Sequence, residues 1–280
     1  MSLSQNNHKI GVIAGYGDFP IEVCNAAQKQ ELEVVLCAIK GEANPSITDP
    51  IKESIWVKLG ELGKVIKFFK ENNVEQVILC GKIHKVNLLK GDVIPDLEML
   101  KLVGRIRNFK DQDLLKKLCD YLGEKGIHII DSTSLLKEAL QLEGVLSKKK
   151  LSQDDWADVS FGYDMAKKMA DLDIGQTVVV KNKSVVAVEG LEGTDQAIAR
   201  GGELAGKSST VVKVARPNQD MRFDVPTIGP DTIESCQKAN IGTLAFESGK
   251  TIILHSEKVI DLVNQSGMKL VSFNPDNNNN

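Results

Sequence analysis

The chain has 280 residues, 42% of them hydrophobic and 26% charged, as expected of a globular protein with one large or two ordinary domains. With 35 basic and 38 acidic residues, its net charge of −3 gives no electrostatic case for binding nucleic acid. The five cysteines show no CxxC or Cys/His spacing, which favours buried thiols in a reducing compartment over zinc ligands.

The N-terminus is not predicted to be a secretory signal. The opening MSLSQNNHK lacks the apolar core of a secretory signal, and no apolar run approaches the ~18 residues that span a bilayer. The tail, residues 274–280, reads NPDNNNN and is predicted to be disordered. We therefore expect a cytoplasmic protein.

In the first half, strands alternate with helices, which predicts a Rossmann-like α/β domain over residues 1–142 with a parallel sheet. The expected strands are Lys9–Ala14, Glu33–Ile39, Ile55–Val57, Gln76–Cys80 and Gly126–Ile130. The expected helices are Pro20–Lys29, Leu62–Glu71, Asp96–Arg107, Asp111–Leu122 and Leu135–Leu140, the last of them capped by the run Asp131-Ser-Thr-Ser.

Residues 143–158 break this alternation with SKKKLSQDDW, a basic run followed by an acidic one, and are predicted to be a linker. Residues 159–273 then predict a C-terminal mixed α/β domain. Its expected helices are Phe161–Leu172, Thr194–Ala205, Asp231–Asn240 and Glu257–Gln265. Its expected strands are two hairpins, Thr177–Glu189 and Leu244–Leu254, and the single strands Thr210–Ala215 and Lys269–Phe273.

A glycine loop follows the first strand. Gly15 and Gly17 would let backbone N–H groups approach an anionic ligand at the start of the next helix. Asp18 could cap that helix or bind a ribose hydroxyl. The spacing lacks the third glycine of the dinucleotide fingerprint, and a plain βα turn would use the same two glycines.

Two further stretches carry candidate residues, one after a strand and one at the start of a helix. Lys82 and His84 follow the strand Gln76–Cys80, a position for contacts to a phosphate or sugar, and His84 is either a general acid–base group or an ordinary surface residue. Lys110 and Asp113 lie where a helix begins; Asp111 is the obvious N-cap, and capping explains Asp113 less completely.

The run VEGLEGTD, residues 188–195, leaves a strand and enters a helix. It holds three carboxylates, those of Glu189, Glu192 and Asp195, and Thr194 is a suitable N-cap for the helix. A structural turn explains the run by itself, but carboxylates at a strand end can also coordinate a hard cation. Because Cys/His clusters are absent, Mg²⁺ or Mn²⁺ fits better than structural zinc.

The stretch Lys213–Gly229, KVARPNQDMRFDVPTIG, is the most informative of the chain. Pro217 and Pro226 restrict the backbone, which predicts a rigid extended loop. Alternation would then place Asp220, Arg222 and Asp224 on one side, where they could hold a cation beside an anionic substrate. The alternative is a surface turn with a structural ion pair.

These stretches together resemble the UDP-2,3-diacylglucosamine pyrophosphatase family of lipid A biosynthesis, in its two-domain Rossmann-like form rather than the metallophosphoesterase form. The resemblance covers nearly the whole chain. It is carried by RFDVPTIG and by IGVIAGYGDFP (Ile10–Pro20), GELGKVIKFFK (Gly60–Lys70), FKDQDLL (Phe109–Leu115), LDIGQTVVV (Leu172–Val180) and VEGLEGTDQAI (Val188–Ile198). It implies hydrolysis of UDP-2,3-diacylglucosamine to UMP and 2,3-diacylglucosamine 1-phosphate (lipid X), by a homodimer with its active site between the two domains.

In that reading Lys213 and Arg222 neutralise phosphate oxygens. Asp224, with Asp220 or Glu192, holds Mg²⁺ or Mn²⁺ or orients the attacking water. The other expected substrate-binding residues are Gly15, Gly17, Asp18, Lys82, Lys110, Asp113, Thr194 and Gln219. A cytoplasmic enzyme would meet such a lipid in peripheral contact with the inner membrane.

Two other classes of function stay open. A non-catalytic nucleotide-sugar-binding protein would bind UDP-sugars and release no UMP. An NAD-dependent oxidoreductase would use the first βα unit to bind NAD(H), although the missing third glycine counts against it.

Overall fold

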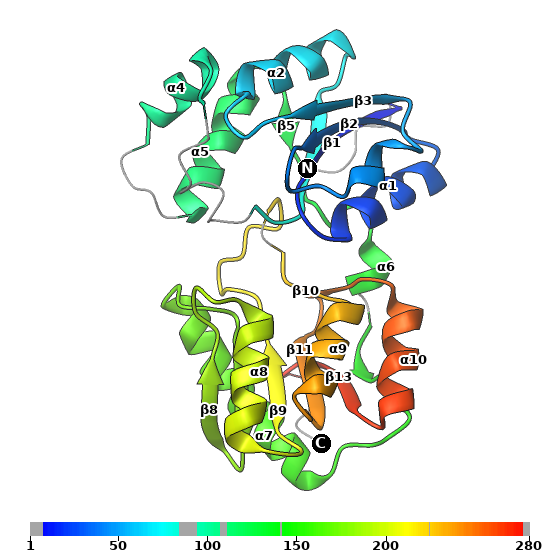
Figure 1. The fold of residues 1–280 in the computed structure, drawn as a ribbon, viewed down its shortest axis with the longest axis vertical. Helices are drawn as coiled ribbons and strands as arrows, with labels where there is room; N and C mark the ends of the chain where they lie inside the picture. Colours follow the sequence, from blue (N-terminus) through cyan, green and yellow to red (C-terminus); the bar gives the residue numbers. More distant parts are fainter. Residues whose placement is uncertain (1–7, 84–93, 107–110, 141, 224, 277–280) are drawn as a thin grey trace. The chain divides into compact units, whose positions relative to one another are not determined.

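The computed structural model describes residues 8–83, 94–106, 111–140, 142–223 and 225–276, without the side chains of residues 111–113. The chain divides into two compact units (Figure 1). Unit 1 takes in residues 1–135 together with residues 220–224, and unit 2 takes in residues 136–219 and 225–280. A short piece of the second half of the sequence therefore belongs to the first unit.

Unit 1 is built on a five-stranded sheet in the order β3-β2-β1-β4-β5, and all four strand pairings are parallel. The strands are β1 (Lys9–Ala14), β2 (Glu33–Ile39), β3 (Glu53–Val57), β4 (Gln76–Cys80) and β5 (His128–Ile129). The predicted Rossmann-like parallel sheet is confirmed, and β5 is shorter than the run Gly126–Ile130 that was predicted.

The described helices of unit 1 also follow the predicted alternation. They are α1 (Phe19–Lys29), α2 (Leu62–Glu71), α4 (Leu97–Val103), α5 (Asp111–Glu124) and the 3₁₀ turn η1 (Pro45–Thr48). On α2, Val65, Ile66 and Phe69 recur at helical spacing and are buried against the sheet. The run after β5 differs from the prediction, because the Asp131 carboxylate accepts from Thr133 in a local turn and does not cap a helix.

One residue of the unit 1 core comes from far along the chain. Phe223 is 3% exposed and belongs to the same hydrophobic cluster as Phe69, Tyr121 and Leu122. Beside it, the N–H and the hydroxyl of Ser132 both donate to the Met221 carbonyl, at 2.9 and 2.8 Å. The segment Asp220–Phe223 is thus anchored in unit 1 by an aromatic side chain and by two hydrogen bonds.

Unit 2 is a mixed α/β structure, as predicted, with a six-stranded sheet in the order β6-β13-β11-β9-β7-β8. β9, β11 and β13 are parallel to one another, whereas β6, β7 and β8 join by antiparallel pairing. The strands are β6 (Gly144–Val145), β7 (Thr177–Lys181), β8 (Ser184–Val188), β9 (Thr210–Lys213), β11 (Thr243–Glu247) and β13 (Lys269–Phe273).

Helices cover both faces of the unit 2 sheet (Figure 1). Val178 and Val180 of β7 pack in the cluster on the α7 side, and Val179 between them packs in the cluster on the opposite face. Because both faces are buried, β7 is a continuous apolar run. The helices are α6 (Lys137–Leu140), α7 (Gln153–Asp171), α8 (Thr194–Ala205), α9 (Pro230–Lys238) and α10 (Ser256–Ser266).

The predicted linker, residues 143–158, is folded within unit 2. Its first part pairs as β6 with β13, and its last part begins α7 at Gln153, eight residues before the predicted start. Ser152 and Asp155 form a capping box there. The acidic run that resembled a linker is therefore the N-terminal turn of a helix.

The second predicted hairpin, Leu244–Leu254, is wrong. β11 lies in the six-stranded sheet, whereas β12 (Ile252–Ile253) pairs in parallel with β10 (Thr227–Ile228) in a separate two-stranded sheet. The turn ESGK does reverse the chain, but the strand that follows finds a non-local partner. The first predicted hairpin, β7–β8, is confirmed.

Candidate active site

The carboxyl ends of β1 and β4 lie side by side in the unit 1 sheet, at the point where the strand order reverses. Ligands of open α/β sheets bind at such a point. The loops that leave these two strands pair with each other: Tyr16 N–H donates to the Lys82 carbonyl at 2.8 Å, and Lys82 N–H donates back to the Tyr16 carbonyl at 3.0 Å. The Lys82 side chain at this edge is exposed.

Close packing of these loops explains one of the two glycines after β1. A Cβ on Gly15 would lie 2.6 Å from the Lys82 carbonyl oxygen, and the Gly15 N–H already donates to the Cys80 carbonyl. Gly17 differs, because its φ is +98° and a Cβ there would meet nothing within 4 Å. Gly17 is therefore the glycine of this loop that faces open space. Asp18 stands at the N-cap position of α1 without a side-chain capping bond.

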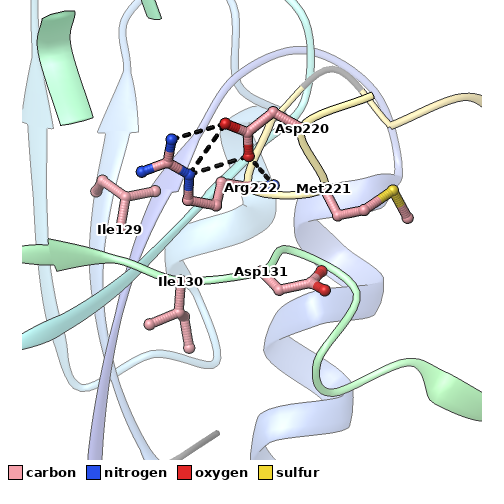
Figure 2. A pocket seen from close by; sticks show the side chains of 6 residues that line it. All are labelled: Ile129, Ile130, Asp131, Asp220, Met221 and Arg222. Carbon is pink, nitrogen blue, oxygen red and sulfur yellow. Dashed lines mark hydrogen bonds and ion pairs between the residues drawn. The ribbon is translucent and has the colours of Figure 1, made fainter. Parts of the chain in front are cut away.

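An open pocket of about 360 Å³ lies where β5 ends (Figure 2). Its lining residues come from two stretches far apart in sequence, Ile129, Ile130 and Asp131 after β5, and Asp220, Met221 and Arg222 from the anchored segment. Since β4 and β5 are parallel neighbours, this pocket opens on the same edge of the sheet as the loops after β1 and β4.

The charged pair in this pocket has a defined geometry. Arg222 Nε and Nη2 donate to the two carboxylate oxygens of Asp220, at 2.9 and 2.6 Å, and Arg222 N–H donates to Asp220 at 3.1 Å (Figure 2). This hydrogen bonding holds the pKa of Asp220 below its ordinary value of 3.8 and raises the pKa of Arg222. Residues 221 and 222 form a turn, so the predicted extended loop is wrong at this point.

The Asp220–Arg222 pair keeps capacity for an anion. A guanidinium has five N–H donors, and Nη1 of Arg222 makes no hydrogen bond within the described residues. The Arg222 side chain is 35% exposed at the pocket, and Asp220 is 20% exposed. The arrangement can therefore fix an arginine in one orientation while part of its guanidinium stays available to a phosphate oxygen.

Two more of the predicted residues meet in unit 2. Lys213 is buried at the end of β9, and its Nζ donates to Thr194 Oγ1 at 3.3 Å. Thr194 Oγ1 donates in turn to Glu189 at 2.9 Å. Thr194 is the first residue of α8 and not its N-cap, because Gly193 with φ +86° takes that position.

Glu192 and Gln219 form hydrogen bonds with residues that are near them in the sequence. Arg200 Nη2 donates to Glu192 at 2.7 Å, and the Gly190 N–H donates to its other oxygen at 3.1 Å. Its own backbone N–H and Arg200 hold the pKa of Glu192 below the ordinary value of 4.5. Gln219 closes a turn with Arg216, whose N–H donates to the Gln219 side chain at 3.4 Å.

The side chains of the remaining predicted residues are not among those that the structure describes. His84, Lys110 and Asp224 are not among the described residues, and for Asp113 the structure gives only a place in the first turn of α5. Among the described residues, no group of three His, Cys, Asp or Glu side chains is arranged to hold a metal ion. Of the predicted metal ligands, Asp220 is hydrogen-bonded to Arg222 and Glu192 to Arg200.

Sequence reasoning missed Ser132 and Phe223, which anchor the Asp220–Phe223 segment. Phe223 lies inside a charged run, and its aromatic side chain was the available signal that part of this run is buried. Ser132 was read as part of a helix cap, and nothing local indicated that it would meet a residue from the other half of the sequence.

Comparison with known proteins covers almost the whole chain. A family model described as the LpxI N-terminal domain matches residues 9–139, and one described as the LpxI C-terminal domain matches residues 142–271. A curated relative from Caulobacter vibrioides, named UDP-2,3-diacylglucosamine pyrophosphatase LpxI, is 27% identical over 278 residues, which cover 95% of this chain and 98% of the relative. Within the described residues, no helix is long and apolar enough to cross a membrane.

Proposed function

The chain belongs to the LpxI family, and from this membership we propose that it hydrolyses the pyrophosphate bond of UDP-2,3-diacylglucosamine, in lipid A biosynthesis. The products are UMP and 2,3-diacylglucosamine 1-phosphate. The structural observation that supports this proposal is the Asp220–Arg222 pair in a pocket at the carboxyl edge of a Rossmann-like sheet. An oriented guanidinium at such an edge suits a pyrophosphate.

The residues of the proposed site divide the tasks of phosphate binding, water activation and substrate recognition. Arg222, oriented by Asp220, donates to phosphate oxygens and stabilises the charge that builds up on them during attack by water. Lys213 supplies a second positive charge from the end of β9. Asp224 holds a metal ion or orients the attacking water. The residues proposed to contact the nucleotide and sugar are Gly15, Gly17, Asp18, Lys82, Lys110, Asp113, Thr194 and Gln219.

Metal dependence is a separate part of the proposal. Mg²⁺ binds through one or two protein carboxylates, with water and substrate phosphates as its other ligands, so it needs no preformed cluster of three side chains. Asp224, with Asp220 or Glu192, is proposed to hold it. A bound Mg²⁺ or Mn²⁺ would neutralise charge on the phosphate oxygens.

The first test is release of UMP from UDP-2,3-diacylglucosamine, with and without a chelator. We expect turnover that stops in excess EDTA and returns when Mg²⁺ or Mn²⁺ is added. Full activity after thorough chelation would reject the metal and leave the hydrolysis standing. Binding of the substrate without UMP release would instead favour a nucleotide-sugar-binding protein, and NAD(H) binding would favour an oxidoreductase.

The second test concerns Asp224. Asp224→Ala should lower kcat by at least ~10²-fold, the usual scale for losing a positioned acid–base or electrostatic group, while the substrate still binds. Asp224→Asn keeps the shape and loses the charge, so it should be nearly as damaging. Normal kcat in Asp224→Ala would remove this residue from the mechanism.

The proposed setting of the enzyme is a cytoplasmic homodimer in peripheral contact with the inner membrane. Support for the membrane contact is the diacylated substrate in the name of the Caulobacter relative. Flotation with anionic vesicles tests this contact, and light scattering on the purified protein tests the dimer. A monomeric mass in light scattering would reject the dimer, and protein that does not float with the vesicles would reject the membrane contact.

A further inference from the structure

A buried ion pair in unit 2 holds both polar backbone groups of Ala215. Glu247, at the end of β11, accepts from the Ala215 N–H at 2.8 Å, and Lys167 of α7 donates to the Ala215 carbonyl, also at 2.8 Å. Lys167 Nζ lies 3.0 and 3.1 Å from the two Glu247 oxygens. We call Lys167, Glu247 and the Ala215 backbone the Ala215 clamp.

The Ala215 clamp is shielded from solvent. The side chains of Glu247 and Lys167 are 5% and 20% exposed, and the Tyr163 hydroxyl donates to Glu247 at 3.3 Å. Burying two charges carries a desolvation cost. Apolar residues of similar volume would often hold a helix against a strand equally well, so stability alone does not explain the pair. The specific feature of this pair is therefore its hold on one residue of the backbone.

Ala215 lies shortly before the chain leaves unit 2 at Gln219. The Arg216–Gln219 turn follows it directly, and the next residue, Asp220, already belongs to unit 1. We call Arg216–Phe223 the crossing segment. Its far end is anchored by Phe223 in the unit 1 core and by the Ser132–Met221 hydrogen bonds. Together with the ion pair between Arg216 Nε and Asp173 Oδ1, which are 3.0 Å apart, the clamp is thus an anchor on the unit 2 side of the residues that line the pocket.

We propose that the Lys167–Glu247 ion pair is a positioning element for hydrolysis, which fixes the backbone at Ala215 and through it the orientation of Asp220 and Arg222 in the pocket. Neither Lys167 nor Glu247 is proposed to touch the substrate. This inference rests on the proposed function, since it assigns the pair a role in the same reaction.

The chain offers a matched control. Asp155 and Lys269 form a second buried ion pair in unit 2, with 2.6 Å between Lys269 Nζ and Asp155 Oδ1 and both side chains 13% exposed. It also joins α7 to the six-stranded sheet, but at the start of β13, and none of its described hydrogen bonds reaches Ala215 or the crossing segment. Both pairs join α7 to the sheet of unit 2, and of the two only the Ala215 clamp bonds to the residue that directly precedes the crossing segment.

The experiment compares Glu247→Gln and Lys167→Met with the control Asp155→Asn. Kinetics of UMP release should show kcat reduced by about ten-fold or more in the clamp variants, with KM changed less, because a mispositioned group loses transition-state contacts. Asp155→Asn should keep the wild-type kcat, even if its melting temperature falls as much as that of the clamp variants. Equal kcat for clamp and control variants of equal stability would overturn the proposal.

Hydrogen exchange gives a readout that does not depend on activity. Glu247→Gln keeps an acceptor oxygen but loses the charge that strengthens the hydrogen bond, so exchange of the Ala215 amide should speed up by about five-fold or more. Asp155→Asn should leave that amide unchanged. Unchanged protection in Glu247→Gln would reject the clamp even if the wild-type protein hydrolysed the substrate.

The same measurement separates the two proposals. If the wild-type protein released no UMP, the proposed function would fail, and faster Ala215 exchange would still support the clamp as an anchor of the crossing segment.

A further variant, Lys167→Arg, replaces Glu247→Gln if that variant folds poorly. Lys167→Arg keeps the positive charge and should restore most of the kcat that Lys167→Met loses.

Discussion

Replacing Phe223 tests whether a residue of the second half of the sequence completes the core of unit 1. Phe223 is 3% exposed among core residues of unit 1, so Phe223→Ala removes a buried ring and leaves a cavity. Such changes cost about 3–5 kcal/mol. For a unit of this size, we expect a fall in melting temperature of about 10–17 °C.

The two tryptophans allow the effect to be assigned to one unit. Trp56 lies in β3 of unit 1, and Trp156 lies in α7 of unit 2. With single-tryptophan versions of the protein, Phe223→Ala should lower the unfolding midpoint reported by Trp56 by more than the midpoint reported by Trp156. The control is Met221→Ala, which keeps the backbone carbonyl that Ser132 binds and should cost at most about 1 kcal/mol.

The outcome that refutes the reasoning is equally specific. If Phe223→Ala left the Trp56 midpoint unchanged, Phe223 would not belong to the unit 1 core in solution. If it lowered only the Trp156 midpoint, the crossing segment would belong to unit 2.

Two other predictions concern unit 1. Gly15→Ala should destabilise it more than Gly17→Ala, because a Cβ at Gly15 lies 2.6 Å from a carbonyl oxygen whereas one at Gly17 meets only backbone strain, and thermal melting followed by Trp56 compares them. Lys101, Tyr121 and Lys125 hydrogen-bond to Glu98 and hold its pKa at about 2, against an ordinary value of 4.5. A lowered pKa gives stability that is complete above pH 4.5 and is lost as the pH falls from 4.5 to 2, so wild type and Glu98→Gln should converge over that range in denaturant titrations.

The fold of unit 1 could be predicted because its signals are local. β1, β2 and β4 are buried apolar runs of five to seven residues ended by polar residues or glycine, and they form at the predicted bounds. Errors arose where one local pattern serves two structures. An acidic run after serine fits a linker as well as a capping box, and ESGK fits a hairpin as well as a turn between two sheets.

The candidate site was predictable in its residue types and only partly in its geometry. The charges of Asp220 and Arg222 marked the right stretch, but alternation on an extended strand was the wrong geometry, because a turn lets the two side chains pair directly. The place of Phe223 and the partners of Ala215 depend on contacts between residues far apart in the sequence. No local pattern encodes such contacts.

The return of Phe223 to unit 1 has a consequence for how the protein is made. Domains generally fold as units during translation, the N-terminal one first. Here the N-terminal unit leaves the ribosome without one of its core side chains, and it cannot close its core until the chain has been translated past Phe223. A nascent chain stalled before that residue should expose an apolar surface to chaperones, and one stalled well beyond it should not.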